Sequence, residues 1–179
     1  MKKIKFTLSK ENLFRENVLS QLLKQGKVGA ETVIFLRNRN VHLSFNKQKN
    51  SAAAWTLSGN IRLNVDVFPY DSEIDEPYLL SLIVHEARHL QQGLLTALSV
   101  YGELDAWQVG FNFYKEMTGK PLEPVLREII DLPLNWSRVN LKEASRLMKK
   151  YSPGYRIDLL PLYPIQHEVI WGLTRKEPK

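Results

Sequence analysis

The sequence predicts an α+β domain, because strand-like patterns occupy its first third and helical patterns dominate from about residue 76 to residue 150. Its 179 residues are 44% hydrophobic, which is enough for one core, and no repeat, low-complexity tract or linker divides them. We therefore expect a single domain over residues 1–179. An N-terminal helix and a small antiparallel or mixed sheet should pack on one central helix, and the part that follows should be mostly helical.

The first 46 residues predict one helix and one hairpin. Ser9 can cap a helix that runs to about Gln25, where a stripe of leucine and valine residues ends before a glycine. The stretches TVIFL (32–36) and VHLSF (41–45) then flank a polar segment that contains Asn38, Arg39 and Asn40, and the second stretch alternates apolar with polar residues. This alternation is typical of a strand with one buried face, so we expect a hairpin.

A second hairpin is expected directly after the first. AAAWTL (52–57) and NIRLNVDVF (60–68) surround Ser58 and Gly59, a pair that favours a tight turn. Apolar side chains occupy every second position from Ile61 to Val67. The pattern predicts a strand with one face towards the core.

The segment PYDSEIDEP (69–77) should be a loop that leads into the central helix. Asp75 is a plausible cap and Pro77 suits the first turn of a helix from about residue 76 to 92, which Gly93 ends. Further helices are expected over about 99–117, 123–131 and 141–151. Residues 152–164 contain three prolines and should be extended or looping.

The central helix carries the stretch LIVHEARHLQQG (82–93), which has metal-binding spacing. His85 and His89 lie one helical turn apart on one face, where two imidazoles can reach one zinc ion at about 2.0–2.1 Å. Glu86 projects from the flank of that face, and in H-E-x-x-H sites this residue is the general base that activates a metal-bound water. The spacing therefore provides two ligands and a base.

The third ligand must be a histidine, aspartate or glutamate, because the chain has no cysteine. One known extension places a glycine and a histidine after the second histidine, but Gln92 and Leu95 occupy those positions. Glu103, in YGELDAW (101–107), would return beside the two histidines in a helix hairpin. Asp105 is the rival, although it points about 200° away around the helix. We favour Glu103, whose face is continued by Ala106, Trp107 and Gly110.

These residues resemble the gluzincin branch of zinc metallopeptidases, especially its small single-domain members, the minigluzincins. The resemblance covers about residues 61–114, and the part from about 120 to 179 would be a C-terminal extension. It implies a zincin-like fold, one Zn²⁺ held by His85, His89 and Glu103, and Glu86 as the base. It also implies that the strand Ile61–Val67 forms the rim of the cleft and binds substrate by strand addition.

Other residues are weaker candidates for the site. A peptidase needs a donor for the oxyanion that forms when water attacks the carbonyl. The late residues Tyr155, Tyr163 and His167 are candidates for this donor, and Arg156 is a further one. Arg88 and Asp105 could form an ion pair that supports the ligands.

Charge and hydropathy limit the partners. The net charge of +6 invites nucleic acid, but the basic residues are scattered and no recognised binding motif accompanies them. The basic start lacks an apolar run of sufficient length, so we expect no signal peptide, no membrane span and a cytoplasmic protein.

Two functions remain open at this point. The first is a zinc-dependent hydrolase that cleaves peptide bonds with metal-activated water and a glutamate base. The alternative is a silent or latent zinc-containing regulatory or binding protein, in which the proline-rich tail or the loop Asp71–Pro77 blocks the cleft. Association with nucleic acid is a third, less favoured hypothesis.

Overall fold

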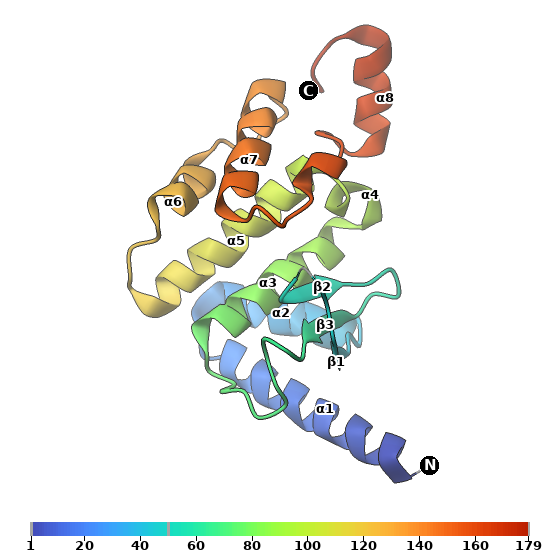
Figure 1. Cartoon of the computed structure of the whole chain (residues 1–179), viewed down its shortest axis with the longest axis vertical. Coiled ribbons are helices and arrows are strands. Elements are labelled where there is room, and N and C mark those ends of the chain that lie inside the picture. The colour runs from blue at the N-terminus through green and yellow to red at the C-terminus, as the bar shows by residue number, and fades with distance from the viewer. Residues whose placement is uncertain (1, 50, 179) are drawn as a thin grey trace.

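The computed structural model describes residues 2–49 and 51–178, with side chains from residue 10 onward, and its architecture is α+β (Figure 1). The helices are α1 (Lys2–Leu22), α2 (Gly26–Asn38), α3 (Pro77–Gln92), α4 (Leu94–Ala97), α5 (Val100–Thr118), α6 (Pro124–Asp131), α7 (Arg138–Tyr151), the 3₁₀ turn η1 (Ile157–Leu159) and α8 (Ile165–Thr174). The strands are β1 (Leu43–Asn46), β2 (Ala53–Trp55) and β3 (Ile61–Asn64). The predicted class is confirmed.

The small sheet is mixed and has the order β1-β3-β2. β3 lies in the centre, parallel to β1 and antiparallel to β2, so the predicted hairpin of residues 52–68 is confirmed. The predicted strand Ile61–Val67 is too long, because β3 ends at Asn64. The Asn64 side chain accepts from the backbone N–H of Gln48 and Asp66 and donates to two carbonyls, which replaces the ladder with a turn.

The N-terminal prediction is wrong in two places. The first helix begins at Lys2, well before Ser9, and ends at Leu22. The stretch TVIFL belongs to α2 and is no strand, so the predicted first hairpin does not exist. The buried residues of α2 are Gly29, Thr32, Val33 and Leu36, a spacing that follows one helix face.

Two hydrophobic clusters fill the interior. The N-terminal cluster joins α1, α2, the sheet and α3, with Leu19, Ile61 and Leu80 among its fully buried members. The C-terminal cluster joins α5, α6, α7 and the tail, with Leu104 and Ile129 at its centre. α3 and α5 run side by side through the middle of the molecule, so they form the seam between the clusters (Figure 1).

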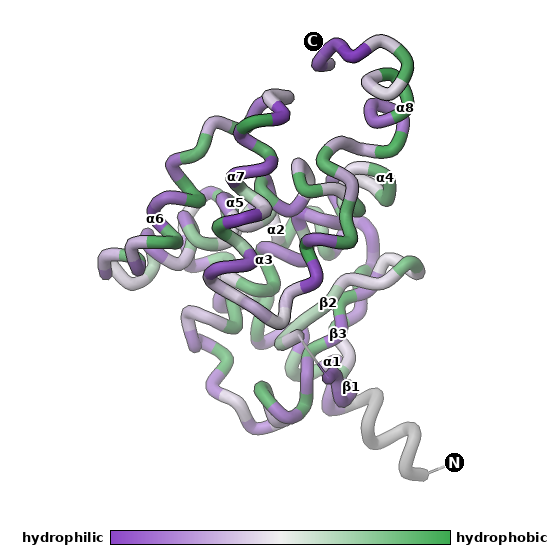
Figure 2. The backbone as a smooth tube through the Cα atoms, turned by 45° about the horizontal axis from the view of Figure 1, so that its top comes forward, coloured by the Kyte–Doolittle hydropathy of each residue, from purple (hydrophilic) through white to green (hydrophobic). Residues whose placement is uncertain are grey.

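The ends of several elements differ from the predicted ones. Glu76, not Asp75, caps α3: its carboxylate accepts from the N–H of Tyr78 and Leu79. After the expected irregular tail the chain forms α8, which was not predicted, and hydrophobic residues recur along it at the end of the molecule (Figure 2). No helix among the described residues is both long and apolar enough to cross a membrane.

Candidate metal site

The seam between α3 and α5 brings His85, His89 and Glu103 together. Gly93 ends α3 with a φ of 78°, and the Ser99 hydroxyl accepts from the Gly102 N–H to begin α5. Gly102 is needed here, because a Cβ on it would lie 2.0 Å from the Thr96 carbonyl oxygen. The short connection therefore turns α5 back along α3, as the predicted helix hairpin requires.

The three side chains present their ligand atoms to one small space. His85 Nε2 and His89 Nε2 are 3.1 Å apart. Glu103 Oε2 lies 3.4 Å from His89 Nε2 and 3.9 Å from His85 Nε2. Ligands that are about 2.0–2.1 Å from a tetrahedral zinc lie roughly 3.4 Å from one another. This group can therefore hold a metal ion with little rearrangement.

In the neutral ring of His89, the surrounding hydrogen bonds place the proton on Nδ1, away from Glu103. The amide nitrogen of Gln92 donates to the Gly102 carbonyl at 2.9 Å and to Asp105 Oδ2 at 2.6 Å. Gln92 Oε1 therefore faces His89 Nδ1, at 3.3 Å, and must accept from it. His89 Nε2 then has only a lone pair to offer, as a metal ligand does.

Glu103, on the opposite helix, also presents an acceptor atom without a donor to this space. Its Oε2 atom is buried and has no hydrogen-bond partner among the described residues. A buried carboxylate oxygen without a donor is costly. The acceptor atoms of neutral His89 and of Glu103 converge on one position, where a metal ion would supply the positive charge that this carboxylate lacks, so the donor set fits a metal.

Burial and the carboxylates shift the pKa values of these groups in different directions. Burial and the neighbouring His89 lower the pKa of His85 to about 4. Burial would also lower the pKa of His89, but the Glu103 carboxylate outweighs it, and the net shift is upward. Burial acts to raise the pKa of Glu103, yet the two histidines bring it below its ordinary value. The site therefore favours a negative Glu103 that faces imidazole nitrogens.

Asp105, the rival ligand, points away from the histidines and supports the site indirectly. Arg88 Nε and Nη2 donate to its two oxygens at 2.8 and 3.2 Å, so the expected ion pair is present. Asp105 also accepts from Gln92, which in turn contacts His89. A chain of contacts thus runs from Arg88 through Asp105 and Gln92 to the His89 ring and fixes its orientation.

Glu86 lies beside the three ligand residues and is held by the sheet. Its Oε2 accepts from the Trp55 N–H at 2.7 Å, and its Oε1 lies 4.0 Å from His85 Nε2. Burial raises the pKa of Glu86 to about 7. A carboxylate with such a pKa is a competent general base near neutral pH. The contact with Trp55 was not predicted, because it depends on which strand lies next to α3.

β2 is the strand at the edge of the sheet beside α3. Thr56 N–H donates to Asn60, and Asn64 N–H donates to Ala52, so these residues bond within the hairpin. The alternation along an antiparallel pair directs the backbone of Ala53 and Trp55 to the other side. The expected rim strand, Ile61–Val67, has no free edge, because β3 is paired on both sides. β2 occupies that position instead.

Tyr155 is the one predicted oxyanion donor that reaches the site. Burial and the nearby Glu103 carboxylate raise its pKa well above the ordinary value. Tyr163 is buried in the C-terminal cluster, and His167 lies 4.9 Å from the Trp136 ring. Arg156 pairs with Asp158. Tyr163 packs into the C-terminal cluster before α8 begins, and α8 holds His167 beside Trp136, so the structure places both apart from the three ligand residues.

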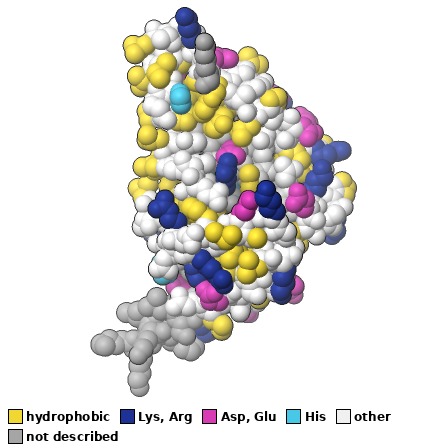
Figure 3. Space-filling model, turned by 180° about the vertical axis from the view of Figure 1, so that it is seen from behind, with side chains coloured by type: hydrophobic (Ala, Val, Ile, Leu, Met, Phe, Trp, Pro, Cys, Tyr) yellow, Lys and Arg dark blue, Asp and Glu magenta, His cyan; other side chains and the backbone are white. Residues whose placement is uncertain are grey.

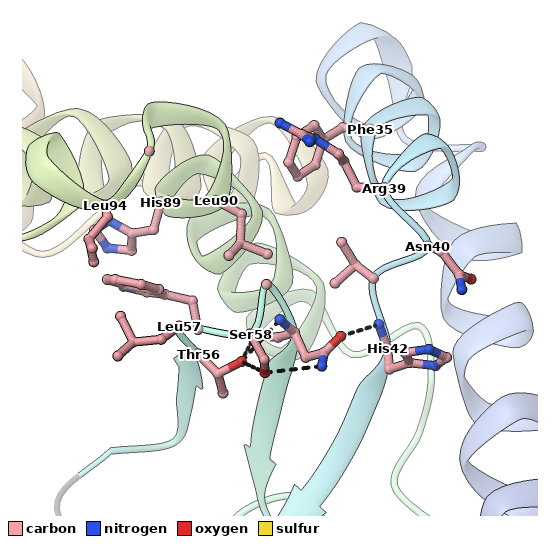
Figure 4. A pocket seen from close by; sticks show the side chains of 15 residues that line it. Phe35, Arg39, Asn40, His42, Thr56, Leu57, Ser58, His89, Leu90 and Leu94 are labelled. Atoms are coloured by element: carbon pink, nitrogen blue, oxygen red, sulfur yellow. Dashed lines mark hydrogen bonds between the residues drawn. The ribbon is translucent and has the colours of Figure 1, made fainter.

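Two hollows adjoin the site, one on each side. The first, which we name the aromatic pocket, has a volume of about 160 Å³ and is lined by His85, Ala53, Trp107, Phe111, Tyr151 and Tyr155, among others. The second, which we name the Arg39 pocket, has a volume of about 540 Å³ and is lined by His89, Trp55, Leu57, Leu94, Arg39 and His42, among others (Figure 4). The site therefore opens in two directions along β2.

Two segments could block the cleft of a latent protein, the loop Asp71–Pro77 and the proline-rich tail, and neither closes both hollows. Residues of the loop Asp71–Pro77 line a separate hollow beside α1. The tail residues Ser152 and Tyr155, together with Tyr151 at the end of α7, form a wall of the aromatic pocket. On the face that Figure 3 shows, Lys and Arg side chains are dispersed among acidic ones, with no basic patch of the kind that nucleic acid requires.

Comparisons with models of known protein families, with curated proteins and with solved structures gave no match to this chain. The chemistry of the site must therefore carry any functional argument.

Proposed function

We propose that this protein is a zinc-dependent peptidase of the gluzincin type with a zincin-like fold. The observation that carries the proposal is the convergence of His85 Nε2, His89 Nε2 and the unpartnered Glu103 Oε2, with Glu86 beside them. Three protein ligands that leave one position for water are typical of catalytic zinc. The zincin-like fold and the cytoplasmic location stay predictions that belong to the same proposal.

Each residue has a distinct part in the proposed reaction. His85, His89 and Glu103 would hold the ion, which when bound polarises a carbonyl and acidifies water. Glu86 takes the proton from the attacking water, since burial already raises its pKa to about 7. Trp55 holds one oxygen of that carboxylate, which leaves the other free to accept the proton.

Tyr155 is the best-supported donor for the oxyanion. Tyr155 lies near Glu103 and also lines the aromatic pocket, so it lies between a proposed metal ligand and the pocket that would hold substrate. Its raised pKa keeps the phenol protonated at neutral pH, so it has a proton to donate. The peptide itself would lie along the outer edge of β2, where the backbone of Ala53 and the carbonyl of Trp55 are directed away from β3, the Trp55 N–H being held by Glu86.

The test is a matched pair, wild type and Glu86→Gln, loaded with zinc. Glu86→Gln keeps all three proposed ligands and the size of the side chain but removes the base. We expect equal zinc content by elemental analysis and a loss of cleavage of about 10²-fold or more on a peptide library read by mass spectrometry. Undiminished cleavage by the variant would refute the mechanism.

The same pair separates a peptidase from the alternative of a silent zinc-containing binding protein. The two open hollows beside His85 and His89 favour the peptidase. A silent protein would bind zinc but cleave nothing in either form. That outcome would favour the structural or binding role.

A further inference from the structure

The Arg39 pocket has an end that the chemistry of peptide cleavage does not use. His89, Leu57 and Leu94 lie at one end of this hollow, and Arg39, Asn40 and His42 lie at the other (Figure 4). Its volume of about 540 Å³ falls within the range of about 300–1,000 Å³ that is usual for ligand sites. The pocket is therefore large enough for a group that extends several bonds beyond the metal ligands.

The far end of the pocket carries a positive charge without a counter-charge. Arg39 has an exposed side chain, and its guanidinium makes no ion pair or hydrogen bond to the residues that the structure describes. No aspartate or glutamate lines the pocket within the described part of the chain. Nearby, the Asn60 side chain already accepts from the His42 N–H and so fixes the loop that forms the floor.

The aromatic pocket on the other side of the site has the opposite chemistry. Apart from His85, the residues that line it are aromatic, aliphatic, small or hydroxyl-bearing, and none is Asp, Glu, Lys or Arg. The two sides of the cleft would therefore select different groups of one substrate: a buried apolar side chain near His85, and a charged group beyond His89.

The direction of β2 assigns these groups to the two ends of a peptide. β2 runs from Ala53, which lines the aromatic pocket, to Trp55, which lines the Arg39 pocket. An extended peptide that pairs antiparallel with this edge runs the other way, from the Arg39 pocket to the aromatic pocket. Residues on the N-terminal side of the cleaved bond therefore lie towards Arg39.

We propose that Arg39 selects peptides with an acidic side chain on the N-terminal side of the cleaved bond. A planar guanidinium matches a carboxylate in shape and charge, and no neighbouring carboxylate competes for it. The proposal rests on the peptidase function above for the position of the cleaved bond, but the recognition step itself concerns binding. Since Arg39 is exposed, its effect will be moderate and will weaken with salt.

A binding experiment tests this without depending on turnover. Zinc-loaded Glu86→Gln protein is titrated with three fluorescent hexapeptides that differ only in the two residues before a central Ala-Leu pair: both are glutamate, both glutamine or both lysine. We expect the glutamate peptide to bind about threefold to tenfold more tightly than the lysine peptide at low salt. Arg39→Glu should abolish or reverse that preference.

Arg62→Glu is the matched control, since Arg62 is an exposed arginine on β3 that lines neither pocket. It produces the same change in net charge and should leave the preference intact. Equal binding of the three peptides, binding of none, or the same loss in both charge-reversal variants would overturn the proposal.

Cleavage by the wild-type protein then separates the two proposals. An acidic preference in binding that depends on Arg39, without cleavage of any peptide, would refute the peptidase function and leave the recognition by Arg39 standing. Cleavage with no preference for the acidic residues would support the peptidase function and refute the recognition by Arg39.

Discussion

The N-terminal and C-terminal clusters of this molecule differ in what they contribute to the site. The N-terminal cluster supplies His85, Glu86 and His89 from one helix, and its sheet supplies Trp55. The C-terminal cluster supplies Glu103 on α5 and Tyr155 on the tail. Neither cluster can make the site alone, so the metal centre depends on the packing of α3 against α5. This dependence can be tested by changing residues on each side of the seam.

The largest expected effect comes from the ligand that the C-terminal cluster contributes. Glu103→Ala removes one of three proposed ligands and should leave the protein with little or no tightly bound zinc. Asp105→Ala removes a residue that only orients Gln92 and Arg88, so a loss of zinc affinity of about 10- to 100-fold is expected. Elemental analysis and competition with a chelator measure both.

The two variants lie two residues apart on the same helix, so each is a control for the other. Zinc loss in Asp105→Ala with full retention in Glu103→Ala would exchange their roles and contradict the geometry. Equal loss in both would mean that the seam itself has opened, which circular dichroism and thermal unfolding would reveal.

The second prediction concerns a substitution that disturbs the packing of α5 against α3 but leaves all three proposed metal ligands in the sequence. A Cβ at Gly102 would lie 2.0 Å from the Thr96 carbonyl oxygen and 3.0 Å from Gln92 Oε1. Gly102→Ala must therefore displace α5 from the α3–α4 connection, and we expect a loss of about 3 kcal/mol in the free energy of unfolding. Zinc affinity should fall with it, because Gln92 and Glu103 both move.

Gly172→Ala is the control for this change. Gly172 is also a helical glycine, but a Cβ there would meet nothing within 4 Å. Its substitution should be neutral or stabilise by up to about 1 kcal/mol. Chemical denaturation measures both values, and an unchanged stability of Gly102→Ala would show that the connection is more tolerant than its contacts indicate.

The parts of the site that sequence could predict are those that depend on local geometry. The spacing of His85, Glu86 and His89 is set by one helical turn, and the α3–α5 hairpin follows from Gly93 and Ser99 at its ends. Trp55 and Arg39 were not predicted as site residues, because their positions depend on strand order and on how the hairpin and α2 lie against α3. Long-range packing of this kind leaves no periodic signal in the chain.

The misassigned elements show the same limit. Val33 and Leu36 fit a helix, yet the short run TVIFL also has the β-branched composition of a strand, and only its burial against the N-terminal cluster favours the helix. The end of β3 at Asn64 depends on side-chain hydrogen bonds to the backbone of a distant loop. Tyr163 and His167 were plausible donors, but Tyr163 is buried in the C-terminal cluster and His167 lies on α8 beside Trp136.

The third and smallest prediction concerns how protons compete with the metal across the seam. Zinc requires neutral imidazoles, so it must displace a proton from any histidine that is protonated. The pKa of His89 is raised by Glu103 from the opposite helix, whereas that of His85 is lowered to about 4. Between about pH 6 and pH 5, only His89 should therefore carry a competing proton.

The measurement uses Glu86→Gln, because the Glu86 carboxyl, with its pKa of about 7, would also lose a proton to a nearby cation. The expected result is a zinc dissociation constant that rises about tenfold for each unit of falling pH in this range, as displacement of one proton requires. Competition with a chelator of known proton affinity measures it. Displacement of two protons would give about a hundredfold per unit and would contradict the separation of the two histidines. In Glu103→Gln the carboxylate that raises the pKa of His89 is gone, so the residual zinc binding should lose this dependence until a lower pH. An unchanged pH dependence in that variant would mean that the Glu103 carboxylate does not raise the pKa of His89.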